Sequence, residues 1–146
     1  METSSTLDTD AILQNYRASI RHIIGDAFEV YNEYRGGLLE SAYEAALCYL
    51  LKKDGFVVEE QKDLPLWFKG VRLQKTYRMD IVLNGKIILE LKATEATQKE
   101  HRLQLFSYLR LTHFPIGILL NFTLDKGLHF EKYYYDEASN RCIAFK

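Results

Sequence analysis

Three ionisable residues near the middle of the chain could together bind a metal ion and cleave a phosphate ester. Asp80 is followed, after a short predicted hairpin, by Glu90 and Lys92. Two carboxylates can hold a divalent cation, and a lysine beside them can stabilise a hydroxide or a phosphate oxygen. This spacing is typical of a metal-dependent phosphodiesterase. The flanking residues are apolar, and because charge is costly to bury, acids in such runs indicate a site rather than a solvated face.

These acids can cooperate only if two neighbouring strands pair in the right register. Asn84 and Gly85 predict the turn between them. A plain two-residue turn would place Asp80 opposite Leu89 and point Glu90 the other way. One more loop residue, or a bulge, would pair Asp80 with Glu90, and we favour this register because bulges are frequent beside active sites. It also gathers a complete apolar face: Met79, Ile81, Leu83, Ile87, Leu89 and Leu91.

Two helices are expected ahead of these strands. Apolar residues recur at helical spacing over Asp10–Tyr31, after a frayed start at residues 1–9 in which Asp8 or Thr9 could cap the helix. A Gly-Gly pair interrupts this pattern. A second helix is then predicted over residues 39–54.

The remainder of the chain predicts strands with one further helix. A helix is expected over residues 97–112. The strongly apolar run at residues 115–122 is typical of a buried strand, and residues 128–135 and 141–145 look like two edge strands. This order of elements predicts a mixed α/β or α+β domain. Extended segments before the acid hairpin are expected at residues 56–61, 64–68 and 71–73.

Length and composition indicate one globular domain over residues 1–146. The chain has 47% hydrophobic and 27% charged residues, and its formal net charge of −1 gives no overall attraction to a polyanion. A nucleic-acid partner would therefore need a local basic patch, and scattered solubilising charges are an equal alternative. The candidates for such a patch are Lys69, Arg72, Lys75, Arg78, Lys99 and Arg102.

The cysteines and the hydropathy pattern bear on the compartment. Cys48 and Cys142 have neither metal-ligand spacing nor the pattern of a disulfide framework, so we interpret them as reduced thiols. Residues 1–6 are polar and lack the features of a signal peptide. No stretch has the apolar length needed to span a bilayer. We expect a soluble, cytoplasmic protein.

A third acid lies at the start of the second predicted helix. Glu40 shares a helical face with Tyr43 and with apolar residues. A carboxylate on such a face needs a partner, and a metal held by Asp80 and Glu90 would provide one. The alternative is an acid at a helix N-terminus that is favoured by the helix dipole.

Five sequence blocks, in order, resemble the GxxExxY proteins of the PD-(D/E)XK nuclease superfamily. The resemblance covers about residues 30–122, and the pair Gln104 and Tyr108 resembles the signature of the RecB-like branch. One departure stands before the first block, where Arg35-Gly36-Gly37 replaces the usual Gly-Pro-Gly turn. The matching residues are Gly37, Glu40 and Tyr43, then Tyr77–Asp80, then Glu90–Ala93, then Gln104 and Tyr108, and finally Ile118–Phe122.

The resemblance implies a central mixed sheet flanked by helices, with the acids at its centre. It implies that Mg²⁺ or Mn²⁺ is bound by Asp80, Glu90 and the carbonyl of Leu91, and that Glu40 completes the ligand set directly or through water. Lys92 would position and help to activate the attacking water.

The resemblance also implies roles around the metal ligands. Gln104 would orient groups near the metal or the phosphate. Arg78, His101 and Tyr108 are candidate substrate contacts, although packing is the better interpretation of Tyr108, which lies on an apolar helical face.

Three functions remain open from the sequence. The first is a metal-dependent nuclease, for which we favour DNA over RNA as substrate. The second is a catalytically silent nuclease-fold module that binds nucleic acid or a protein partner. The third is a scaffold that forms a homodimer through the aromatic segment Phe130–Tyr135, although we prefer to interpret that segment as a covered edge strand.

Overall fold

A computed structural model describes residues 3–146, with side chains from residue 10 onward. Six strands form one sheet in the order β1-β2-β3-β4-β5-β6, and only the β3–β4 pair is parallel. This arrangement confirms the predicted mixed α+β class. The elements are α1 (Thr3–Tyr34), α2 (Glu40–Lys53), β1 (Val58–Phe68), β2 (Val71–Leu83), β3 (Ile87–Lys92), α3 (Lys99–Thr112), β4 (Ile116–Phe122), β5 (Leu128–Asp136) and β6 (Arg141–Ala144).

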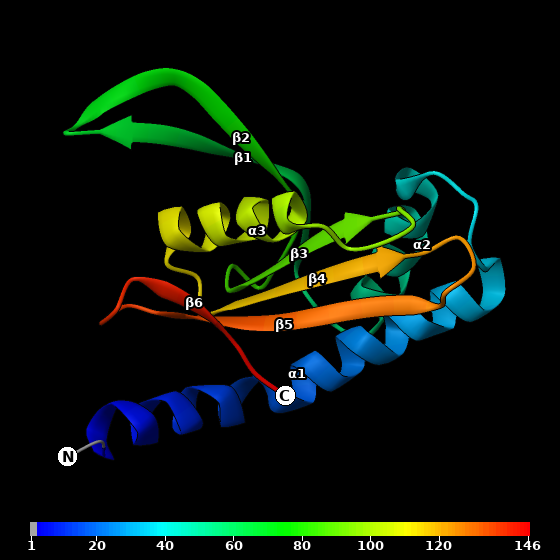
Figure 1. The fold of residues 1–146 in the computed structure, drawn as a ribbon, viewed down its shortest axis with the longest axis horizontal. Helices are drawn as coiled ribbons and strands as arrows, with labels where there is room; N and C mark the ends of the chain where they lie inside the picture. The colour runs from blue at the N-terminus through cyan, green and yellow to red at the C-terminus, as the bar shows by residue number, and fades with distance from the viewer. Residues whose placement is uncertain (1–2) are drawn as a thin grey trace.

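Helices cover both faces of the sheet, and each face has its own apolar cluster (Figure 1). On one face α1 and α2 pack against the inward residues of β3 and β4, such as Leu89 and Ile118. On the other face α3 packs through Leu105 and Leu109 against Ile88. The two central strands are buried on both sides, which explains why apolar residues run through them without alternation, apart from Glu90, Lys92 and Asn121.

The predicted register of the acid hairpin is confirmed. Leu83 pairs with Ile87, so the loop between them has three residues rather than two, and Ile81 pairs with Leu89 two residues further along. Continuing that ladder places Asp80 opposite Glu90, as the apolar pattern required.

One member of the predicted apolar face lies elsewhere. Met79 belongs to the cluster under α3, whereas Ile81 belongs to the cluster under α1 and α2. The ladder between β2 and β3 begins only at Ile81. Before that residue β2 stays paired with β1, and the two strands extend together past the sheet and over α3 (Figure 1). Simple alternation therefore fails across this bend.

Two further boundaries differ from the sequence prediction. Helix α1 begins at Thr3, so the proposed caps Asp8 and Thr9 lie inside it; residues 1 and 2 lie outside the described part of the chain. Strand β5 is not an edge, because it pairs with both β4 and β6. Pairing on both sides gives β5 more ladder hydrogen bonds than an edge position would, and the edges of the sheet are β1 and β6.

Two further features are the state of the cysteine thiols and the apolar length of the helices. Cys48 and Cys142 are both free. Burial raises the pKa of the Cys48 thiol to about 12, so the thiol stays protonated at neutral pH. Among residues 3–146, no helix has the length and apolar character needed to cross a membrane.

An acid pair between α1 and α2 should make stability depend on pH. Burial and the neighbouring carboxyl of Asp54 raise the pKa of Asp26 from 3.8 to about 7. A raised folded-state pKa gives stability that is complete below about pH 4 and is lost as the pH rises towards about 7. We expect Asp26→Asn to raise the free energy of unfolding above neutral pH by about 1 kcal/mol, a value discounted because the group is only partly buried.

Denaturant unfolding across this pH range measures the effect. The exposed loop residue Asp125 provides the control, since Asp125→Asn removes the same charge without removing a buried pair. Equal pH dependence in the wild type and Asp26→Asn would show that the pair does not contribute.

Candidate active site

The two central acids are locked together by backbone hydrogen bonds. Glu90 Oε1 accepts the backbone N–H of Asp80 at 3.1 Å, and Asp80 Oδ2 accepts the N–H of Leu91 at 2.8 Å. Glu90 is 1% exposed, although it carries a carboxylate. Asp80 lies on β2 and Glu90 on β3. The pairing of β2 with β3 and of β3 with β4 therefore fixes the positions of both carboxyl groups.

The electrostatics of this pair favour a bound cation. Burial raises the pKa of Glu90 well above its ordinary value, and the charge of Asp80 adds to the rise. The backbone N–H of Asp80 and the ammonium of Lys92 oppose it only in part. Two adjacent acids in a low-dielectric setting therefore repel each other, and a positive charge placed between them would relieve that cost.

Lys92 is held in place by a chain of hydrogen bonds along α3. Its Nζ donates to Gln104 Oε1 at 2.9 Å, and Gln104 Nε2 donates to the hydroxyl of Tyr108 at 2.9 Å. Tyr108 is only 2% exposed and its ring lies 6.0 Å from that of Tyr77. The buried tyrosine therefore anchors Gln104, which in turn positions the lysine. Its burial does not fit the substrate contact considered from the sequence.

Glu40 joins the site from the start of α2. Burial raises its pKa, Lys92 lowers it, and Asp80 raises it, so the carboxyl lies within electrostatic reach of both. The backbone N–H of Ala93 also lowers the pKa of Glu40. The structure thus brings Glu40, Asp80, Glu90, Lys92 and Gln104 together.

The loop before Glu40 explains two other residues of the sequence motif. Tyr43 is fully buried, and its hydroxyl donates to the carbonyl of Arg35 at 2.6 Å while accepting the N–H of Leu38 at 3.2 Å. Its ring stacks on Phe122 with 4.4 Å between centroids. Gly37 has a φ of 103°, a conformation that favours glycine. Tyr43 and Gly37 therefore stabilise the turn that positions Glu40 at the start of α2.

Sequence analysis missed a fourth acid and its partner. Glu44 lies one helical turn after Glu40, and Gln61 Nε2 donates to Glu44 Oε1 at 2.9 Å and to Asp80 Oδ1 at 3.5 Å. Burial and the charge of Asp80 raise the pKa of Glu44 to about 7. The i, i+4 spacing from Glu40 could have indicated Glu44, whereas no local signal marked Gln61.

A second missed residue shapes the loop that follows Lys92. Asn121 is fully buried on β4, opposite Lys92 in the parallel ladder. Its Oδ1 accepts the N–H of Thr94 at 3.0 Å, and its Nδ2 donates to Thr94 Oγ1 at 3.1 Å and to Thr97 Oγ1 at 3.3 Å. Asn121 therefore fixes the connection from β3 to α3.

Two predicted substrate contacts have other partners. Arg78 lies on the β1–β2 hairpin and forms an exposed ion pair with Asp63 at 3.1 Å, so the structure does not join it to the acids. His101 belongs to the capping box of α3, where its Nδ1 accepts the N–H of Gln98 at 3.1 Å. Burial and the charge of Lys92 lower the pKa of His101. His101 therefore lies near the site, as a neutral imidazole.

The gathered side chains fit a hard divalent cation by their chemistry. Four carboxyl groups, those of Glu40, Glu44, Asp80 and Glu90, lie within electrostatic reach of one another, and Lys92 acts on Glu40 and Glu90. Carboxylate oxygens are the ligands that Mg²⁺ and Mn²⁺ prefer. Within residues 3–146, no three acidic, histidine or cysteine side chains converge closely enough to define a coordination sphere. Asp80 and Glu90 instead direct oxygens at backbone N–H groups.

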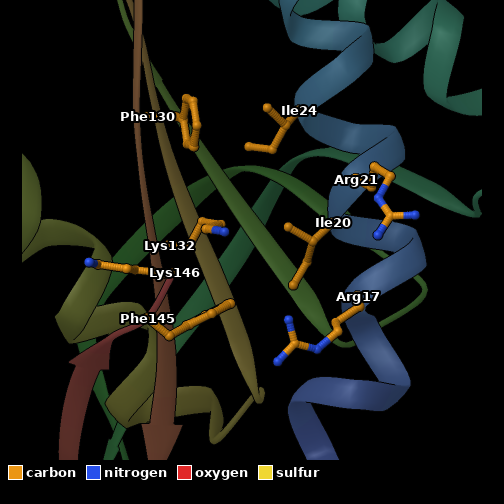
Figure 2. Close-up of a pocket in the computed structure, with 8 residues that line it drawn as sticks. All are labelled: Arg17, Ile20, Arg21, Ile24, Phe130, Lys132, Phe145 and Lys146. Atoms are coloured by element: carbon orange, nitrogen blue, oxygen red, sulfur yellow. The ribbon is translucent and has the colours of Figure 1, made fainter.

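A separate basic hollow lies on the α1 side of the sheet (Figure 2). The hollow is lined by residues from α1, from β5 and from the C-terminal end of the chain. Its volume is about 260 Å³. None of the acids described above contributes to it. Its lining residues are Arg17, Ile20, Arg21, Ile24, Phe130, Lys132, Phe145 and Lys146.

Comparison with known proteins identifies the class. A family model described as the PD-(D/E)XK nuclease superfamily matches residues 17–132. The chain therefore belongs to the PD-(D/E)XK nuclease superfamily, whose members generally hydrolyse phosphodiester bonds.

A solved structure titled "Crystal structure of SSO0001" is similar over 68% of this chain and 52% of that one, with 25% sequence identity and a TM-score of 0.47. This chain thus corresponds to about half the length of that protein. No curated protein matches the sequence.

Proposed function

We propose that this protein is a metal-dependent nuclease that hydrolyses phosphodiester bonds, with DNA as its substrate. The observation that carries this proposal is the buried carboxylate of Glu90 against Asp80, next to a lysine that Gln104 holds in place. A structural ion pair would not need two adjacent acids. Membership of the nuclease superfamily supports the same chemistry.

Asp80, Glu90, the carbonyl of Leu91 and Glu40 would hold Mg²⁺ or Mn²⁺. When bound, the ion would lower the pKa of water and neutralise charge on the phosphate oxygens. Lys92, held by Gln104, places a positive charge beside the attacking water and the phosphate. Because Gln104 is itself anchored to a buried tyrosine, the lysine needs little reorganisation during the reaction.

We also propose that the chain belongs to the GxxExxY proteins within the superfamily, and to the RecB-like branch. Two sets of contacts support this. The tyrosine and glycine of the first motif shape the turn before Glu40. Gln104 and Tyr108 of the helical motif hydrogen-bond to each other and to Lys92, so both motifs have a physical role here.

Cleavage of labelled single-stranded and duplex DNA and RNA tests the proposal. The wild type with Mg²⁺ or Mn²⁺ is expected to cleave DNA, and chelation of the metal is expected to stop cleavage. Asp80→Ala and Lys92→Ala should each lower the rate by about 10²-fold or more, because each removes charge stabilisation of the transition state. Circular dichroism confirms that each variant is folded. A folded wild type that cleaves none of the substrates, with no thermal shift on adding metal, would instead indicate a silent binding module.

A further inference from the structure

A groove runs between the β1–β2 hairpin and helix α3. The hairpin contributes Leu66 and Tyr77 to its lining, and the helix contributes Ser107, Arg110 and Leu111. The volume of the groove is about 450 Å³. Figure 1 shows the hairpin passing over the outer side of α3. The groove is therefore bounded by two elements that each carry a residue of the candidate active site, Asp80 on β2 and Gln104 on α3.

The groove is joined to the proposed active site by direct contacts. Tyr77 in the groove lies 6.0 Å from the ring of Tyr108, whose hydroxyl accepts from Gln104, the partner of Lys92. Arg110 follows Gln104 by six residues on the same helix, which is a rise of about 9 Å. A chain that leaves the active site along α3 would enter the groove within one or two nucleotides.

The groove and the outer hairpin carry positive charge that has no acidic partner. Residues 64–77 contain Lys69, Arg72 and Lys75 and no Asp or Glu. Within the described residues, neither of these lysines nor Arg110 forms an ion pair. His113, which also lines the groove, pairs with Glu137 at 3.2 Å, so the unpaired positive charge is concentrated on the hairpin and at Arg110, where it suits a polyanion.

Exposed aromatic rings accompany these charges. Lys75 Nζ lies 5.2 Å from the ring centroid of Tyr77, and Lys69 Nζ lies 5.6 Å from that of Phe68. Phe68 is 60% exposed. Trp67 is also 60% exposed, and both rings lie at the end of the hairpin, beyond the irregularity that interrupts the β1–β2 register between Pro65 and Trp67.

We infer that this groove binds a single strand of nucleic acid and leads it to the acids. Positive charge interleaved with aromatic rings is the combination that holds unpaired strands, since the rings stack on exposed bases and the cations pair with phosphates. Bases in a duplex are stacked on each other and cannot use Phe68 and Tyr77 in this way. The inference rests on the proposed nuclease function and adds the class of substrate.

Fluorescence anisotropy with labelled oligothymidylate, in chelator and in an Asp80→Asn background, measures binding without cleavage. The triple variant Lys69→Ala, Lys75→Ala and Arg110→Ala should bind more weakly than its parent. The slope of log Kd against log salt should fall by about 2, because each phosphate contact in a single strand contributes about 0.7. The matched control is Arg17→Ala, Arg21→Ala and Lys132→Ala, which removes three charges from the hollow of Figure 2 and should leave the slope unchanged.

Two single substitutions separate stacking from charge. Phe68→Ala should weaken binding by about 10-fold or more, the usual effect of losing one stacked base. Tyr49→Ala removes a ring that is 65% exposed on α2, on the other side of the sheet, and should have little effect. A blunt duplex of the same length should bind more weakly than the single strand and should not distinguish Phe68→Ala from its parent.

Equal losses in the two triple variants, or in Phe68→Ala and Tyr49→Ala, would overturn the inference. So would tighter binding of the duplex. Cleavage by the wild type is measured in parallel with Mn²⁺, so the two proposals can fail separately. If the wild type cleaves DNA but the groove variants bind the strand as tightly as their parent, the groove proposal is rejected and the nuclease proposal is retained. Groove-dependent binding without any wild-type cleavage would keep the groove as a binding site and reject the nuclease.

Discussion

Replacing Glu90 with glutamine is expected to stabilise the metal-free protein while removing its cleavage activity. Glu90 is 1% exposed, and burial together with the adjacent Asp80 raises its pKa well above the ordinary value. A glutamine oxygen can still accept the N–H of Asp80, and its amide can donate to the Asp80 carboxylate. The substitution therefore exchanges a repulsion for a hydrogen bond.

The sign of the pH dependence follows from the direction of that shift. A raised folded-state pKa contributes stability below the unfolded value of 4.5, and this stability is lost as the pH rises. In chelator at neutral pH, Glu90→Gln should raise the free energy of unfolding, because a glutamine at this buried position carries no charge to desolvate. The rate of cleavage with Mn²⁺ should fall by about 10²-fold or more, because a ligand carboxylate is lost.

Denaturant unfolding and a cleavage assay on the same preparations measure both effects. Glu33→Gln, at an exposed position of α1, is the matched control and should change neither quantity appreciably. If Glu90→Gln destabilised the metal-free protein, the pair would be a stabilising element of the fold rather than a site in need of a cation.

Replacing Gly36 with alanine is expected to destabilise the protein strongly. An added Cβ would lie 2.1 Å from the carbonyl oxygen of Leu124 and 2.3 Å from that of Thr123. These are backbone atoms, and the Thr123 carbonyl is also held by the hydroxyl of Tyr31 at 2.9 Å, so the neighbouring loop cannot move aside cheaply. We expect a loss of about 2–4 kcal/mol in the free energy of unfolding.

The same substitution elsewhere on the chain provides the control. Gly25 lies inside α1, and an added Cβ there would meet nothing within 4 Å. Gly25→Ala should therefore stabilise the protein by about 0.5–1 kcal/mol, because alanine favours a helix. Thermal and denaturant unfolding of the two variants should give opposite signs. Equal, small effects would show that the loop around Gly36 can separate from the loop around Thr123.

The sequence was most informative where pattern and chemistry agreed. The apolar alternation around Asp80 and Glu90 overruled the Asn-Gly turn signal, and the structure has the longer loop that this required. Motif spacing also placed Glu40, Lys92 and Gln104 in one region, which the hydrogen bonds and electrostatics bear out. In the hairpin, the buried face restricted the alternatives to one register.

The sequence was least informative where position depends on distant packing. Gln61 contacts Glu44 and Asp80 only because β1 folds back beside α2, and its own φ of 48° is not encoded by any local turn signal. Met79 changes side because β2 leaves β3 at Asp80 and follows β1 over α3. The cap of α3 uses His101, which motif comparison suggested as a substrate contact. Tertiary contacts rather than residue type decide these positions.

The most direct measurement is the rate of cleavage of single-stranded DNA as a function of Mn²⁺ concentration, for the wild type and Asp80→Asn prepared side by side. A metal-dependent, saturable rate in the wild type that falls by about 10²-fold or more in the variant is the expected result. Strand affinity in chelator provides the check that both proteins still bind. Equal rates in the two proteins, or no cleavage by a folded wild type at any metal concentration, would contradict a catalytic centre built on Asp80 and Glu90.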